Sequence, residues 1–169
     1  MAYETFGFSE EKILMRDSIL GLLGRALPAE KMLEFDKNSS FPEEAFQAVA
    51  ADGWLGLPIV EAYGGAGASN MDMAVFIEAL GYYHYGIRSA YMTTSIYGAS
   101  HLQYHASEVQ RREMLPRMIK GQLKMCIAYS EPESGSDAAG IRTRALRNGD
   151  GYVINGQKIY ITNAHVSDW

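Results

Sequence analysis

The chain has 169 residues, 47% of them hydrophobic and 21% charged, with a formal net charge of −5 and a pI near 5.4. This composition is typical of a globular protein and excludes a disordered chain. The acidic balance argues against a general nucleic-acid binder, which needs a surplus of Lys and Arg. The single cysteine, Cys126, excludes an intrachain disulfide and a Cys-Cys zinc site. With no targeting leader and no apolar run long enough to span a bilayer, we expect a cytoplasmic protein that binds neither membrane nor nucleic acid.

Two helix starts are predicted in the first part of the chain. Ser9, followed by Glu10 and Glu11, predicts a capped helix whose opening turn places negative charge at the positive end of the helix dipole. Ser40 and Glu43 have the spacing of a capping box and predict a second start. The apolar face of this second helix is expected to consist of Ala45, Phe46, Val49 and Ala50.

Three further helices are predicted before about residue 121. Ser69 and Asp72 have capping-box spacing and predict the first of them. The next is expected over residues 89–104. Ser107 and Gln110 form another capping box and predict the last helix.

Beyond residue 121 the hydrophobic period changes from helical to two. This alternation, with Asn-Gly and Asp-Gly turns, predicts four short strands at 123–130, 141–146, 152–155 and 158–162. The fold class is therefore α+β: an all-α N-terminal domain, residues 1–122, followed by the first strands of an antiparallel β domain, residues 123–169. A meander of this size leaves an apolar face and an edge exposed, so we expect it to open a larger domain and the chain to be incomplete.

Several residue groups could carry chemistry but favour a structural interpretation. His101, His105 and Glu108 have zinc-ligand spacing, yet the helix is expected to end before Glu108. The glycine-rich loop 64–67 could cradle a phosphate, but no strand of Rossmann type leads into it. We therefore predict no metal site. Packed or solvated side chains are also the favoured interpretation for Cys126, Arg142, Arg144 and Arg147.

The strongest remaining candidate is the loop 129–137, which follows a predicted strand directly. Gly135 permits close approach of a ligand, and three serines offer small hydrogen-bonding groups. Its three carboxylates would be unfavourable beside a phosphate unless they point into the protein and tie the loop. From its residues alone, this loop leaves the function undecided.

Two motifs, in order and at matching spacing, resemble the acyl-CoA dehydrogenase family. Residues 130–137, Ser-Glu-Pro-Glu-Ser-Gly-Ser-Asp, are similar to the family signature Thr-Glu-Pro-x-x-Gly-Ser-Asp. Residues 155–163, Asn-Gly-Gln-Lys-Ile-Tyr-Ile-Thr-Asn, resemble the second flavin segment Asn-Gly-x-Lys-x-Trp-Ile-Thr-Asn. The loop 58–67 also resembles its counterpart in the family, so the likeness covers essentially the whole chain.

The resemblance implies that FAD is the cofactor. Ser130, in place of the usual Thr, is expected to hydrogen-bond the pyrimidine side of the flavin. Tyr160, in place of Trp, is expected to pack against the ring, and Thr162 to hydrogen-bond near flavin N5. Ser136 is expected to touch both the cofactor and the CoA portion of the substrate. The full set of expected cofactor-binding residues is Ile127, Ala128, Tyr129, Ser130, Gly135, Ser136, Tyr160, Ile161 and Thr162.

The resemblance also implies an activity in fatty acid metabolism. The family removes the α-proton of an acyl-CoA thioester with a glutamate base while a β-hydride passes to the flavin, giving a trans-2-enoyl-CoA. Electrons leave through an electron-transferring flavoprotein, and a homotetramer is expected. The segment 89–97 is expected either to line the acyl pocket or to pack as an ordinary helix. The base is expected beyond Trp169, so no catalytic residue is assigned, and the chain alone is expected to be inactive.

Two alternatives stay open. One is a flavin oxidase or monooxygenase of the same fold. The other is a non-catalytic fragment or partner subunit, because the C-terminal catalytic domain of the family is absent from the sequence. Acyl chain length and branching are not fixed by these residues, since pocket volume sets them.

Overall fold

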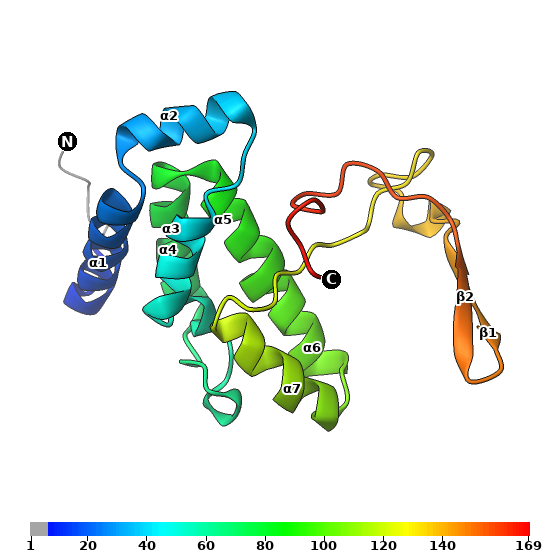
Figure 1. Ribbon diagram of the computed structural model, residues 1–169. Helices are drawn as coiled ribbons and strands as arrows, with labels where there is room; N and C mark the ends of the chain where they lie inside the picture. The colour runs from blue at the N-terminus through cyan, green and yellow to red at the C-terminus, as the bar shows by residue number, and fades with distance from the viewer. Residues whose placement is uncertain (1–6) are drawn as a thin grey trace.

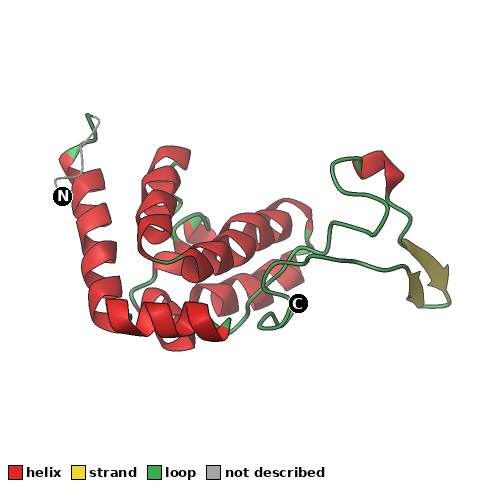
Figure 2. Cartoon of the chain, turned by 90° about the horizontal axis from the view of Figure 1, so that it is seen from above, coloured by secondary structure: helices red, strands yellow, loops and turns green. Residues whose placement is uncertain are grey.

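A computed structural model describes residues 7–169, so the first six residues of the predicted helical domain lie outside the described part. Helices pack into one body, and the chain beyond them runs out to a hairpin that stands away from this body (Figures 1 and 2). The helices are α1 (Glu10–Ala26), α2 (Ala29–Asn38), α3 (Glu43–Ala51), α4 (Asn70–Tyr83), α5 (Tyr85–Tyr91), α6 (Ala99–His105) and α7 (Glu108–Ile119). A π-helical segment, η3 (Met92–Gly98), joins α5 to α6, and short 3-10 turns are η1 (Trp54–Gly56), η2 (Glu61–Tyr63) and η4 (Ala138–Gly140).

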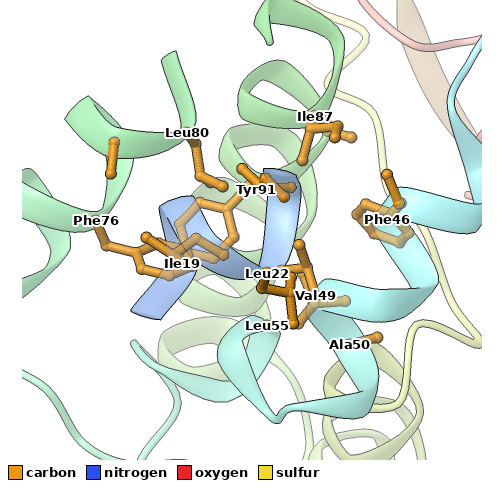
Figure 3. Close-up of a cluster of buried hydrophobic side chains, with 14 of the residues drawn as sticks. Ile19, Leu22, Phe46, Val49, Ala50, Leu55, Phe76, Leu80, Ile87 and Tyr91 are labelled. Atoms are coloured by element: carbon orange, nitrogen blue, oxygen red, sulfur yellow. The ribbon is translucent and has the colours of Figure 1, made fainter. Parts of the chain in front are cut away.

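The main core lies between α1, α3, α4 and α5, as Figure 3 shows. Phe76 and Tyr91 are fully buried at its centre, with ring centroids 4.9 Å apart. The apolar face predicted for the second helix is confirmed, because the buried residues of α3 are Ala45, Phe46, Val49 and Ala50. A smaller cluster under α7 ends in the fully buried Leu123, which anchors the start of the second part of the chain to the helices.

Two of the predicted capping boxes are confirmed. Ser69 accepts a hydrogen bond from the backbone N–H of Asp72 and starts α4, while Ser107 does the same with Gln110 and starts α7. Ser9 is the N-cap residue of α1, as predicted, but its side chain makes no capping hydrogen bond. Local sequence patterns therefore predict the N-cap residue of each of these three helices correctly.

The capping box predicted at Ser40 is wrong. Pro42, not Ser40, is the N-cap residue of α3, and no side chain caps this helix. The reason lies in α2, which was not predicted: Ser39 turns the chain with a φ of +49°, and the backbone N–H of Ser40 bonds back to Phe35 O at 3.0 Å. Ser40 therefore closes α2 instead of opening α3. The α2 helix has no buried residue, and its Met32 and Phe35 side chains pack only partly buried against the main core.

The helix expected over 89–104 is longer than predicted and irregular. It starts at Tyr85, where the His84 ring nitrogen Nδ1 accepts a hydrogen bond from Gly86 N at 3.1 Å, and it passes through η3 before ending at His105. A π-helical turn widens the backbone and often marks a functional site.

The second part of the chain contains one antiparallel hairpin, β1 (Arg144–Asn148) with β2 (Gly151–Asn155), paired from Arg144↔Asn155 to Asn148↔Gly151. The strand predicted at 152–155 is therefore confirmed. The one predicted at 141–146 starts late, because a carboxylate takes the backbone N–H groups of Arg142 and Thr143. All ten hairpin residues are exposed, the large apolar ones Leu146, Tyr152, Val153 and Ile154 among them.

The strands predicted at 123–130 and 158–162 are wrong. Among the described residues, these segments are joined by one backbone hydrogen bond, from Ile159 N to Ser130 O at 3.0 Å, and by the side-chain bond from Lys158 Nζ to Tyr129 O. A strand needs a repeating ladder with a neighbour, which these bonds do not provide. The end of the chain returns to the helical body, where Cys126 N donates to Trp169 O at 2.8 Å (Figure 1). Within the described residues, no helix has the length and apolar character needed to cross a membrane.

Candidate functional site

An open cavity of about 340 Å³ lies where the two motifs meet the π-helical segment η3. One side comes from the first motif and the extended segment before it, a second side from residues 160–162 of the second motif, and a third from η3. The lining residues are Thr93, Tyr97, Ile127, Tyr129, Ser130, Tyr160, Ile161 and Thr162. The structure therefore gathers six of the nine expected cofactor-binding residues around one cavity.

The other three expected residues lie outside this cavity. Ala128, Gly135 and Ser136 are exposed and do not line it. A methyl group at Gly135 would meet no atom within 4 Å, so the space beside this glycine is open. These residues can contact a bound molecule only if it extends out of the cavity along the loop after Ser130.

A nearly buried carboxylate ties the two motifs together. Glu131, 5% exposed, accepts hydrogen bonds from Arg142 N at 2.7 Å and Thr143 N at 2.9 Å, and its Oε1 lies 2.8 Å from Lys158 Nζ. Lys158 also donates to Tyr129 O at 2.9 Å, beside the cavity. The Lys158 ammonium, followed by the Thr143 side chain and the backbone donors of Arg142 and Thr143, lowers the pKa of the Glu131 carboxyl to about 2. Glu131 is therefore one carboxylate that points inward and ties the loop, as the sequence required.

The loop after Glu131 is closed on itself. Glu131 and Ser134 exchange backbone hydrogen bonds in an isolated bridge, and the Ser134 hydroxyl donates to Asp137 O. Ser134 is buried, whereas Glu133 and Asp137 are exposed to solvent. Hydrogen bonds within the loop therefore fix the backbone of the first motif. Because Ser130 directly precedes this loop, its position at the cavity is fixed as well.

The second motif reaches the cavity through an unusual backbone turn. Tyr160 and Asn163 have φ values of +55° and +64°, in the left-handed region that non-glycine residues seldom occupy. The Tyr160 side chain is 91% exposed although it lines the cavity. Such backbone conformations concentrate at functional sites, where the surrounding structure enforces them.

Two lining residues, Thr93 and Tyr97, were not singled out from the sequence. They lie four residues apart in η3 and line the cavity; Thr93 is buried like its neighbours Thr94 and Ser95, whereas Tyr97 is exposed. Segment 89–97 therefore contributes two residues to this cavity and packs others into the helical body, while its role in an acyl pocket stays a prediction. The hydroxyl-rich run from Met92 to Gly98 inside a helix is the signal that could have identified them.

The residue groups interpreted as packed or solvated side chains are found in such surroundings. His101 and His105 are exposed, with rings 6.1 Å apart, and Glu108 lies in the next helix, where it pairs with Arg112 at 2.7 Å. Among residues 7–169, no three or more His, Cys, Asp or Glu side chains are grouped so that they could hold a metal. Of the remaining positions, Cys126 is half-buried, and the arginines at 142, 144 and 147 are exposed.

The glycine-rich loop is closed by its own backbone hydrogen bonds. A methyl group at Gly65 would lie 1.9 Å from Ile59 O, and Gly67 N bonds to Ile59 O at 2.8 Å. The backbone of this loop is therefore used to close the loop itself, not to cradle a ligand.

Comparisons with known proteins give a consistent result. The family profile described as acyl-CoA dehydrogenase, N-terminal domain, matches residues 9–122, and the one described as acyl-CoA dehydrogenase, middle domain, matches residues 126–169. The probable acyl-CoA dehydrogenase YngJ of Bacillus subtilis is 32% identical over 159 residues, which cover 94% of this chain and 42% of that protein. The chain thus spans about two-fifths of the length of this curated relative.

Solved structures of similar fold extend this result. Glutaryl-CoA dehydrogenase from Mycobacterium smegmatis has a TM-score of 0.89 and 29% identity, with 98% of this chain and 42% of that chain covered. The prolyl acyl carrier protein oxidase AnaB has a TM-score of 0.83 and 27% identity, with 96% and 43% covered. The arrangement of helices and hairpin therefore follows that of larger enzymes.

Proposed function

Because the chain belongs to the acyl-CoA dehydrogenase family, we propose that it carries the helical domain and the beginning of the β domain of an FAD-dependent enzyme. The proposed reaction is α,β-dehydrogenation of an acyl-CoA thioester to a trans-2-enoyl-CoA. The observation that supports it most directly is the single cavity at which both motifs meet.

The lining of the cavity suits a flavin ring. Tyr129 and Tyr160 offer aromatic surface, while Ser130 and Thr162 offer hydroxyl groups, and none of the lining side chains is charged. A flat heteroaromatic ring with polar edges requires this combination of apolar walls and a few fixed hydrogen-bonding groups. FAD, when bound, supplies the acceptor for the hydride.

The residues of the chain act by orienting the cofactor and substrate. We propose that Ser130 hydrogen-bonds the pyrimidine side, Tyr160 packs against the ring, and Thr162 hydrogen-bonds near flavin N5. The exposed Gly135 and Ser136 are proposed to follow the pyrophosphate, with Ser136 also reaching the CoA portion of the substrate. Ile127, Ala128 and Ile161 complete the proposed set.

The wider assignments rest on the family. We propose that electrons leave through an electron-transferring flavoprotein and that the enzyme is a cytoplasmic homotetramer acting in fatty acid metabolism. The division into residues 1–122 and 123–169 is proposed as the domain boundary. No described residue is assigned as the catalytic base.

A flavin oxidase is the second candidate, because AnaB, an oxidase that acts on a prolyl acyl carrier protein, shares the fold at a TM-score of 0.83. The carrier in its name also makes an acyl carrier protein, in place of CoA, an alternative thioester donor. Both candidates use the same proposed flavin site.

The deciding experiment follows the flavin absorbance of the gene product that contains this chain, loaded with FAD under anaerobic conditions. Addition of an acyl-CoA is expected to bleach the flavin band, and free CoA serves as the control. Slow reoxidation after admission of air supports a dehydrogenase, whereas rapid reoxidation favours the oxidase. A protein that binds FAD but is not bleached by any acyl thioester contradicts the proposal.

A further inference from the structure

We propose that Asn163 is a positioning residue whose side-chain amide holds the second motif against the π-helical segment η3. It would thereby set the separation of two walls of the cavity. The importance of this separation rests on the proposed function, in which the cavity holds the flavin. The contact itself is present in the protein alone and can be tested without a cofactor.

The position of Asn163 requires a particular residue type. Its φ of +64° lies in the left-handed region, which asparagine occupies more readily than most other side chains. Its carbonyl oxygen accepts from Val166 N at 3.0 Å and from the Ser167 hydroxyl at 2.9 Å, which closes a turn. The backbone at Asn163 is therefore set by the turn, and the side chain is left to make a distant contact.

This contact crosses from the second motif to the helical body. Asn163 Nδ2 lies 3.4 Å from Ser89 Oγ and 3.3 Å from Thr93 Oγ1. These two residues precede Asn163 by 74 and 70 positions in the sequence. Both hydroxyl groups belong to buried residues. The spacing of four between Ser89 and Thr93 places them on one side of the helix.

The hydrogen-bond count identifies the amide nitrogen as the bonding group. The Ser89 hydroxyl lies 3.0 Å from Gly86 O and 3.4 Å from Asn163 Oδ1. Thr93 Oγ1 directs its proton to Ala90 O at 3.3 Å. With the single Ser89 proton on the nearer acceptor, Gly86 O, both hydroxyl oxygens accept from the Asn163 amide nitrogen. The two N–H bonds of one amide match these two acceptors, so removing the amide leaves two buried acceptors with one partner fewer.

The contact lies directly beside the cavity. Thr93 lines the cavity as well as accepting from Asn163, and Asn163 immediately follows the lining residue Thr162. A shift of Asn163 therefore moves residues 160–162 relative to η3.

Thr94, next to Thr93, accepts a hydrogen bond from the segment that leads into the first motif. Thr94 Oγ1 accepts a hydrogen bond from Met125 N at 3.1 Å, shortly before the lining residue Ile127. Adjacent hydroxyls of η3 thus receive N–H groups from the two segments that carry the motifs. The π-helical turn is the common anchor of both cavity walls.

The test compares hydrogen exchange in the chain without added cofactor. Asn163→Gly keeps the left-handed backbone and removes the amide, and Thr93→Val keeps the shape of the side chain and removes the hydroxyl. The amides of Ala164 and Val166, which are hydrogen-bonded within the turn, are expected to exchange about tenfold faster in both variants. Thr93→Ser retains the acceptor and is expected to exchange like the wild type.

Two further variants make the result specific. Asn163→Gly already removes the bonds to both Ser89 and Thr93, so the double variant Asn163→Gly/Thr93→Val is expected to exchange no faster than Asn163→Gly alone. Thr94→Val is expected to accelerate exchange at Met125 and to leave Ala164 and Val166 unchanged. Unchanged exchange in Asn163→Gly and Thr93→Val, or effects that simply add in the double variant, would overturn the inference.

An FAD titration followed by flavin fluorescence separates this inference from the proposed function. The dissociation constant for FAD is expected to rise about tenfold in Asn163→Gly, which alters no residue that lines the cavity. If the wild type binds no FAD while the exchange pattern holds, the proposed function fails and the contact stands. If Asn163→Gly binds FAD like the wild type, the positioning role fails and the flavin site stands.

Discussion

Lys158 Nζ lies 2.8 Å from Oε1 of Glu131, twenty-seven positions earlier in the chain, and this ion pair joins the two motifs. Only 5% of Glu131 is exposed, and its other contacts are backbone N–H groups at the start of the hairpin. A charge held this way is stabilising only while its partners are present, because an unpaired buried carboxylate is costly. The pair therefore connects the fold of the hairpin to the geometry of the cavity.

Lys158→Met is expected to weaken FAD binding more than it weakens the helical body. It removes the cation from Glu131 and the donor from Tyr129 O, both next to the cavity, and leaves the core under α1, α3, α4 and α5 untouched. FAD titration and far-UV circular dichroism check this pair of effects. Lys37→Met, in the last turn of α2, is a matched control that removes a lysine far from the site. Equal FAD affinity in both variants contradicts the role given to Lys158.

The low pKa of Glu131 predicts an acid-dependent loss of stability. The folded protein holds this pKa at about 2, below its ordinary value of 4.5, so the carboxylate contributes its full stabilisation only above about pH 4.5. The contribution is lost progressively as the pH falls from about 4.5 toward 2. Urea unfolding across this range, followed by a probe in the hairpin, is expected to show a steeper pH dependence for the wild type than for Glu131→Gln. Parallel curves for the two proteins would count against this assignment.

The sequence predicted features that depend on a few neighbouring residues and missed those that depend on distant partners. The capping boxes at Ser69 and Ser107 are closed within four residues, and both are present. Ser40 has the same local pattern, but its backbone N–H is taken by the end of α2, a competitor that the pattern does not contain. Alternation likewise predicts a strand at residues 123–130 but says nothing about whether a neighbour is available to form a ladder, and none is formed there.

The same division applies to the candidate site. Motif resemblance identified Ser130, Tyr160 and Thr162, which the fold brings to one cavity. It did not identify Thr93 and Tyr97, because their placement depends on the π-helical turn of a segment that precedes both motifs. The partners of Glu131 could not be predicted either, since a sequence does not show which carboxylate of a loop points into the protein.

Tyr91→Phe is expected to leave stability unchanged or to raise it by up to about 1 kcal/mol. The Tyr91 hydroxyl is buried with no hydrogen-bond partner among the described residues, and burial raises its pKa. Phenylalanine keeps the ring contact with Phe76 and removes the unsatisfied group. Tyr91→Ala, which removes the ring itself, is expected to cost about 3–5 kcal/mol. Chemical denaturation measures both, and a large loss in Tyr91→Phe would show that the hydroxyl has a partner.

Gly65→Ala is expected to destabilise the helical domain by about 1–3 kcal/mol or more. Its methyl group would lie 1.9 Å from Ile59 O, and backbone atoms have little freedom to move away. Gly135→Ala is the matched control, since a methyl group there meets no atom within 4 Å and is expected to change stability by no more than about 0.5 kcal/mol. Thermal unfolding of the two variants checks the difference. If Gly65→Ala unfolds like the wild type, the tight packing of this loop is wrong.

Tyr160→Ala separates the proposed cofactor contact from the fold. The side chain is 91% exposed while lining the cavity, so its removal is expected to change the free energy of unfolding by no more than about 0.5 kcal/mol. The affinity for FAD is expected to fall about tenfold, because a ring that packs on the flavin contributes roughly 0.5–1.5 kcal/mol beyond the area it buries. Tyr160→Phe keeps the ring and is expected to bind FAD like the wild type. An unchanged FAD affinity in Tyr160→Ala would contradict the proposed packing of this ring against a flavin.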